Sequence, residues 1–110
     1  ITMWGDGSPT RDFLFVEDAV RAILVVAEQY DNSEPINLGS EEEISIKNLV
    51  EKISNIMEYD GEIKWDTTKP NGQPRRCVGY KKLREQFNFK PKISLDEGLR
   101  KTISWFENNY

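Results

Sequence analysis

Residues 4–18 read Trp4-Gly5-Asp6-Gly7-Ser8-Pro9-Thr10-Arg11-Asp12-Phe13-Leu14-Phe15-Val16-Glu17-Asp18, and the rest of the chain is best understood from this stretch. Its glycines tolerate positive φ and its proline fixes φ, so it begins with a compact turn. Residues 13–15 then predict a short buried strand, with Arg11 at its rigid entrance. Because a guanidinium stays charged and binds phosphate or carboxylate oxygens in pairs, Arg11 is a candidate anion-binding residue. The alternative is that Arg11 pairs with a nearby acid such as Asp12 or Asp18.

The composition is typical of one soluble globular domain. The chain has 110 residues, of which 37% are apolar and 31% charged; it is too short for a nucleotide-binding domain together with a substrate domain. The longest apolar run, residues 22–27, is far shorter than a membrane span, so no membrane partner is expected. The chain begins with Ile1 and shows no signal peptide, which suggests a fragment of a longer protein. A net charge of -4 argues against nonspecific binding to nucleic acid.

Two residue counts restrict the chemistry. The chain has no histidine, so it lacks the most common general base and a common zinc ligand, and no metal site is predicted. It has one cysteine, Cys77, which cannot form an internal disulfide. A lone cysteine fits a reducing compartment, so we expect a cytoplasmic location.

Apolar periodicity and turn residues predict helices that alternate with strands. Helical spacing is found at residues 17–29, 46–57, 80–87 and from residue 95 onward, with Ser45 and Ser94 as helix N-caps. Besides residues 13–15, short strands are predicted at residues 36–38 and 62–66, and a loop at residues 69–74. Together they indicate a small mixed α/β unit.

The charge distribution singles out one segment. Between Lys69 and Arg84 there are six basic residues and no acidic one, in a chain that is acidic elsewhere. This asymmetry favours an anionic ligand near the loop at residues 69–74. The alternative is an ordinary solvated basic face.

Two segments resemble motifs of a known family. Residues 4–18 resemble the Trp-Gly, Arg-[Asp/Glu]-Phe and Val-x-Asp segment of the extended short-chain dehydrogenase/reductase family, which contains NAD(P)-dependent sugar-nucleotide epimerases, dehydratases and reductases. Residues 68–76 resemble the Lys-Pro-Asp-Gly-x-Pro-Arg-[Lys/Arg] motif of its GDP-L-fucose synthase branch. Residues 36–40 and 94–99 extend the resemblance through the chain.

The resemblance implies that residues 1–110 are the C-terminal sugar-nucleotide-binding portion of a Rossmann-type enzyme. The full-length enzyme would use NADP(H) to epimerise GDP-4-keto-6-deoxy-D-mannose at two carbons and to reduce its 4-keto group. By motif match, Trp4, Arg11 and Asn71 contact the nucleotide-diphosphate sugar, and Lys69 and Arg75 are further phosphate contacts. Asn71 stands where the family motif has Asp, which loses a charge but keeps an acceptor and gains two donors. The alternatives are solvation of the two loop cations and packing of the tryptophan under its loop.

The residues that carry redox chemistry in this family are not found in the sequence. There is no glycine-rich dinucleotide turn and no Tyr-x-x-x-Lys pair; Tyr80-Lys81-Lys82-Leu83-Arg84 has arginine at the lysine position and is predicted to lie in an ordinary surface helix. We therefore expect no catalytic or cofactor-binding residue in this chain. The resemblance implies that an N-terminal Rossmann domain supplies both, that the full-length protein is a homodimer, and that the fragment alone is inactive.

Two other functions are compatible with the sequence. One is the C-terminal part of a dehydratase or epimerase that acts on a dTDP or UDP sugar, which the first motif and Asn71 permit. The other is a non-catalytic binding module that uses the basic loop to contact nucleic acid or protein. The acidic net charge and the lack of aromatic residues among the basic ones count against it.

Overall fold

Two small sheets organise the chain, and the computed structural model describes all residues from 1 to 110. In the first sheet, β1 (Thr2–Trp4) pairs with β4 (Lys64–Asp66) in parallel. In the second, β2 (Thr10–Asp12) lies between the antiparallel strand β3 (Glu43–Ser45) and the parallel strand β5 (Arg75–Arg76). The strands are so short that each sheet depends on pairing between segments distant in sequence.

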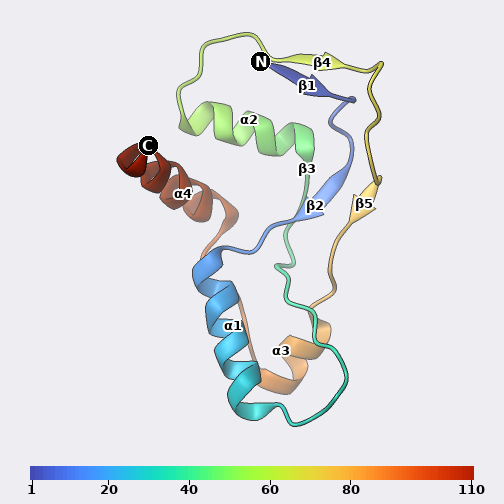
Figure 1. The fold of residues 1–110 in the computed structure, drawn as a ribbon, viewed down its shortest axis with the longest axis vertical. Helices are drawn as coiled ribbons and strands as arrows, with labels where there is room; N and C mark the ends of the chain where they lie inside the picture. Colours follow the sequence, from blue (N-terminus) through green and yellow to red (C-terminus); the bar gives the residue numbers. More distant parts are fainter.

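The chain also forms four helices. They are α1 (Val16–Gln29), α2 (Ile46–Ile56), α3 (Lys81–Phe87) and α4 (Leu95–Asn109). In Figure 1, α2 and α4 lie near the sheets at one end of an elongated molecule, and α1 and α3 lie at the other end. The molecule measures 50 × 33 × 19 Å. The prediction of a small mixed α/β unit is confirmed.

The helix starts follow from local sequence. The Ser45 hydroxyl accepts a hydrogen bond from the backbone N–H of Asn48 at 3.1 Å, and the Ser94 hydroxyl accepts one from Glu97 at 3.3 Å. Both predicted N-caps are thus confirmed, and each satisfies a helix N–H that has no partner within the helix. The Glu97 carboxylate pairs with Lys101 at 3.4 Å.

Two strand predictions are wrong. Residues 13–15 pair with no strand, because the backbone that lies between β3 and β5 is that of β2, immediately before them. Phe15 instead precedes α1 in an extended conformation and packs against Gly98 of α4. Residues 36–38 also pair with no strand, since Ile36 and Leu38 contribute their side chains to the core without a backbone ladder.

The core is small and lies at the α1 and α3 end. Its buried apolar residues are Ala22, Tyr80, Leu83 and Phe89. Beside them is Asp18, which is only 1% exposed; its carboxylate pairs with Arg21 and accepts hydrogen bonds from the backbone N–H groups of residues 92 and 93 at 2.9 and 2.8 Å. Asp18 therefore fastens the segment before α4 to α1.

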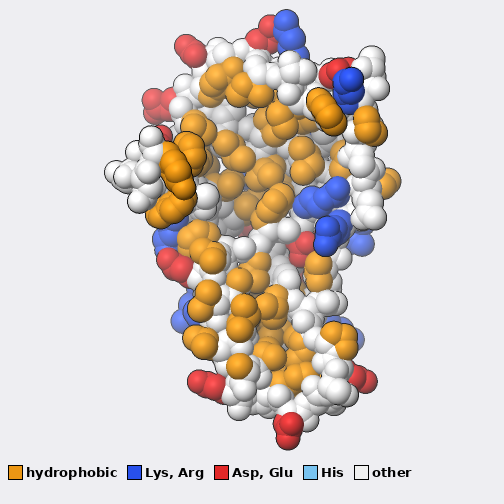
Figure 2. Space-filling view, viewed as in Figure 1, with side chains coloured by type: hydrophobic (Ala, Val, Ile, Leu, Met, Phe, Trp, Pro, Cys, Tyr) orange, Lys and Arg blue, Asp and Glu red, His pale blue; other side chains and the backbone are white.

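A large part of the apolar surface is open. On α1, Val16, Val20, Ile23 and Leu24 are exposed, and on α4 so are Trp105 and Phe106. Figure 2 shows apolar side chains over both ends of one face, with Lys and Arg side chains beside them over β2 and β5. The helix α1 is thus covered on one side only. No helix has the length and apolar character needed to cross a membrane.

Candidate functional site

The turn at residues 4–8 and the loop at residues 69–74 meet in the fold. Asn71 Oδ1 accepts a hydrogen bond from the backbone N–H of Asp6 at 2.8 Å. The loop is held at both ends as well, because Gly5 N–H donates to Asp66 O and Thr10 N–H donates to Pro74 O, each at 2.9 Å. The two segments that resemble family motifs are therefore joined along one edge of the molecule (Figure 1).

Glycine is required where the loop touches the turn. Gly5 has a φ of +77°, and a Cβ built on it would lie 1.9 Å from Asn71 Oδ1. Gly7 has a φ of +75°, and its Cβ would lie 2.6 Å from the Trp65 ring and 2.8 Å from Lys47 Cβ. Both glycines allow close approach by another part of the chain, so the turn is closed against its neighbours.

Trp4 and Lys69 form the outer part of this edge. The Trp4 side chain is 68% exposed, and Lys69 Nζ lies 5.8 Å from its ring centroid, which is cation–π distance. The alternative in which Trp4 packs under its loop is therefore not realised in this structure. Lys69 forms no ion pair with a carboxylate. An aromatic face and a cation are available to a ligand here.

Arg75 is held by an acid that sequence reasoning did not predict. Glu43 of β3 accepts from Arg75 Nε and Nη2, each at 2.8 Å, and also from the Thr10 hydroxyl. The Arg75 and Thr10 hydrogen bonds lower the pKa of Glu43 from 4.5 to about 2. This group ties the three strands of the second sheet together. The edge of the Arg75 guanidinium that carries Nη1 is not engaged by Glu43.

Arg11 lies in the middle of β2 rather than at a strand entrance. Its Nη1 donates to the Thr10 carbonyl at 2.6 Å, and it forms no ion pair. The alternative that Arg11 pairs with Asp12 or Asp18 is therefore not realised. Most of its donors remain available.

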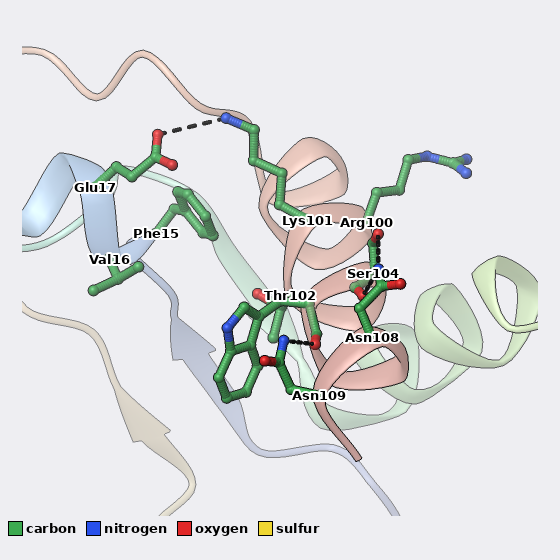
Figure 3. Close-up of a pocket in the computed structure, with 10 residues that line it drawn as sticks. Phe15, Val16, Glu17, Arg100, Lys101, Thr102, Ser104, Asn108 and Asn109 are labelled. Carbon is green, nitrogen blue, oxygen red and sulfur yellow. Dashed lines mark hydrogen bonds and ion pairs between the residues drawn. The ribbon is translucent and has the colours of Figure 1, made fainter.

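The main hollows of the molecule lie elsewhere. The largest, about 870 Å³, lies between the start of α1 and α4, where Figure 3 shows Glu17 and Lys101 joined by an ion pair of 3.5 Å. The five predicted contact residues line none of the main hollows. The turn, the loop and β2 form an open ledge, in which Lys69 lies beside Trp4 and Asn71 contacts the turn, whereas Arg11 and Arg75 lie on the neighbouring strands β2 and β5.

Comparison with known proteins shows which proteins the chain is similar to. Residues 1–39 match the model of the NAD dependent epimerase/dehydratase family. GDP-L-fucose synthase 1 of Arabidopsis thaliana is 37% identical over 109 residues, which cover 99% of this chain and 33% of that protein. A GDP-L-fucose synthetase of Naegleria fowleri, solved bound to NADP, matches with a TM-score of 0.91 at 30% identity, over 99% of this chain and 35% of the other. UDP-glucose 4-epimerase of Thermotoga maritima, solved with UDP-glucose, matches with a TM-score of 0.87 at 30% identity, over 98% and 35% of the two chains.

The chain is similar to the NAD dependent epimerase/dehydratase family, whose model matches residues 1–39, and to GDP-L-fucose synthases over 99% of its length. Its relatives are nucleotide-sugar epimerases and reductases of the extended short-chain dehydrogenase/reductase type, and the predicted resemblance is confirmed. The chain spans about a third of the length of these relatives.

The glycine turn of this chain does not fit an NAD(P) dinucleotide. Binding of its diphosphate requires a glycine-rich turn that leads from a strand into a helix. In this chain the pair Gly5 and Gly7 leads from β1 into β2, and Asn71 and Trp65 fill the space in front of these glycines. The glycine turn is used to seat the loop, so this chain itself offers no dinucleotide cradle.

Proposed function

We propose that residues 1–110 form the C-terminal sugar-nucleotide-binding part of an NADP-dependent GDP-4-keto-6-deoxy-D-mannose 3,5-epimerase/4-reductase that is similar to GDP-L-fucose synthase. The observation that carries the proposal is the contact of the loop with the turn, in which the Asp6 N–H donates to Asn71 Oδ1 at 2.8 Å. Two segments about 60 residues apart in sequence thereby contribute to one ledge. The similarity to GDP-L-fucose synthases over 99% of the chain supports it.

Each predicted contact has a role suited to its chemistry. Trp4 stacks on the base or sugar, since its face is open. Arg11 binds the diphosphate, because a guanidinium binds phosphate oxygens in pairs. Lys69 adds a positive charge beside Trp4, and Arg75 uses the edge that Glu43 leaves free. Asn71 seats the loop and presents its amide N–H groups to the ligand.

The rest of the full-length protein would supply the chemistry. An N-terminal Rossmann domain would bind NADP(H) and carry the catalytic residues, and binding energy from the ledge would position the sugar against them. The open apolar side chains of α1 and α4 support this arrangement, since the relatives are about three times as long and that surface needs a covering partner. We further propose a homodimeric, cytoplasmic enzyme, with residues 1–110 inactive alone.

Turnover by the full-length protein tests the proposal. We expect NADPH oxidation with GDP-4-keto-6-deoxy-D-mannose, no turnover by residues 1–110 alone, and tighter binding of GDP than of UDP or dTDP. The Arg11→Ala variant should bind GDP more weakly while its circular dichroism spectrum is retained. Absence of turnover together with equal binding of the three nucleotides would refute the assignment.

A second candidate is an epimerase or dehydratase that acts on a UDP or dTDP sugar. It is favoured by the fold match to the Thermotoga enzyme solved with UDP-glucose, and by Asn71 at a position that carries Asp in the family motif. Preferential binding of UDP or dTDP in the same titration would support it over the first candidate.

A further inference from the structure

The register of the second sheet sorts its arginines onto two faces. Thr10 is paired with Arg75, and Arg11 is paired with both Arg76 and Ile44. Neighbouring side chains along a strand point to opposite faces, whereas paired residues on adjacent strands share a face. Arg11 and Arg76 are therefore on one face, and Arg75 is on the other.

Side-chain contacts confirm this sorting independently. Glu43 reaches both Thr10 and Arg75, so these three residues share a face. The opposite face carries Arg11, Arg76 and, on the other side of Arg11, the apolar Ile44. The acid that neutralises Arg75 is thus on the wrong face to neutralise its neighbour.

Arg11 and Arg76 form a cation pair without an acid. Neither takes part in an ion pair, and the only side-chain hydrogen bond of the two is that from Arg11 to the Thr10 carbonyl. Like charges directly opposite each other on adjacent strands destabilise a sheet. A bound anion would relieve this repulsion and would be held by two guanidinium groups from adjacent strands.

We propose that Arg76, together with Arg11, binds the diphosphate of the sugar nucleotide, and that Arg75 serves chiefly to tie the sheet through Glu43. This inference rests on the proposed function, because that function supplies the nucleoside diphosphate. It assigns the dominant second cation of the site to Arg76, which fills the last position of the second motif but was not predicted as a contact, and gives Arg75 the lesser share of ligand binding.

Titration of the full-length protein with GDP tests the pair. Loss of one charge-assisted contact pair corresponds to about a tenfold weaker affinity, so Arg76→Ala should raise the Kd for GDP about tenfold or more. Arg76→Lys should recover part of the loss, and Arg75→Ala should weaken binding less than Arg76→Ala. Arg100→Ala, which removes another arginine without an ion pair, on α4, is the matched charge control and should leave the Kd unchanged.

Titrations with guanosine and NADPH show whether Arg11 and Arg76 bind the diphosphate of GDP or that of the dinucleotide. Guanosine lacks phosphate, so its affinity should be the same for Arg76→Ala and the parent protein. A loss of affinity for NADPH in place of GDP would overturn the proposal, because the pair would then hold the dinucleotide. An unchanged Kd for GDP in Arg76→Ala, with weaker binding in Arg11→Ala, would overturn the Arg76 assignment and leave the proposed function intact. Weak binding of GDP by the parent protein itself would overturn the proposed function.

Discussion

Replacement of Gly5 by alanine should break the contact between turn and loop. At a φ of +77° an alanine is strained, which costs about 1 to 2 kcal/mol. Its Cβ would also lie 1.9 Å from Asn71 Oδ1 and 3.1 Å from Asn71 Cα, so the hydrogen bond from the Asp6 N–H to Asn71 must be lost. That bond contributes about 1 kcal/mol. We expect Gly5→Ala to lower the free energy of unfolding by about 2 to 3 kcal/mol.

Gly72 provides a matched control in the same loop. Its φ is +76°, but nothing lies within 4 Å of a Cβ built on it. Gly72→Ala should therefore show the backbone strain alone, about 1 to 2 kcal/mol. The difference between the two variants isolates the contact between the loop and the turn.

Urea unfolding and GDP titration of the full-length protein measure both consequences. Tryptophan fluorescence is a suitable probe, since Trp4 ends β1 and Trp65 packs on the turn. Gly5→Ala should weaken GDP binding, and Gly72→Ala should not. In an Asn71→Ala background, Gly5→Ala should cost about 1 kcal/mol less than in the parent protein, because the displaced side chain is already absent. Equal losses of stability and affinity for Gly5→Ala and Gly72→Ala would refute the coupling of loop and turn.

Three further predictions concern single residues. Asp18→Ala should lower the free energy of unfolding by about 3 kcal/mol, because the backbone N–H groups of residues 92–93 lose a buried acceptor; Asp31→Ala, in an exposed loop, is the control in the same urea titration. The pKa of Glu43 is lowered from 4.5 to about 2 in the fold. The ionised Glu43 carboxylate therefore stabilises the fold fully above pH 4.5, and this stabilisation is lost as the pH falls towards 2. Glu43→Gln should reduce the pH dependence of the free energy of unfolding, measured in urea, in that interval. Trp4→Ala should change stability by at most about 0.5 kcal/mol, because the side chain is 68% exposed, yet weaken GDP binding in calorimetry, with Trp4→Phe in between.

The helices could be predicted from sequence because their signals are local. Ser45 and Ser94 cap the helices that their positions predicted, and α1 begins within one residue of the predicted start. The starts of α2 and α4 depend on hydrogen bonds between residues three positions apart, which a sequence pattern contains in full.

The strands could not be predicted in the same way. β2 and β5 consist of three and two residues, and each becomes a strand only because the other lies beside it, about 65 residues away in sequence. The apolar run at residues 13–15 has the composition of a strand but no neighbour to pair with. Whether a segment forms a strand depends here on a pairing partner that is distant in sequence, and local composition does not identify that partner.

The candidate site likewise has a part that could be predicted from sequence and a part that depends on strand pairing. The residue types of Trp4, Arg11 and Lys69 indicate ligand chemistry by themselves, and the structure brings Lys69 to the Trp4 ring and Arg11 beside Arg76. The sequence alone could not predict that Arg76 shares a face with Arg11, because this depends on the register between β2 and β5. Alternation along β5 would have given this result if its pairing with β2 had been known.

The proposed N-terminal domain would explain both the open ledge and the open apolar surface. Sites for small molecules usually bury most of the ligand, whereas Trp4 remains 68% exposed and the ledge has no second wall. The basic side chains over β2 and β5 lie beside the apolar surface on the face shown in Figure 2. A domain that packs on α1 and α4 would therefore cover apolar surface and bring a second wall towards the ledge in the same step. Docking of that domain and closure of the nucleotide site would then be one structural event, which is the arrangement expected of an enzyme that holds its substrate between two parts of the chain.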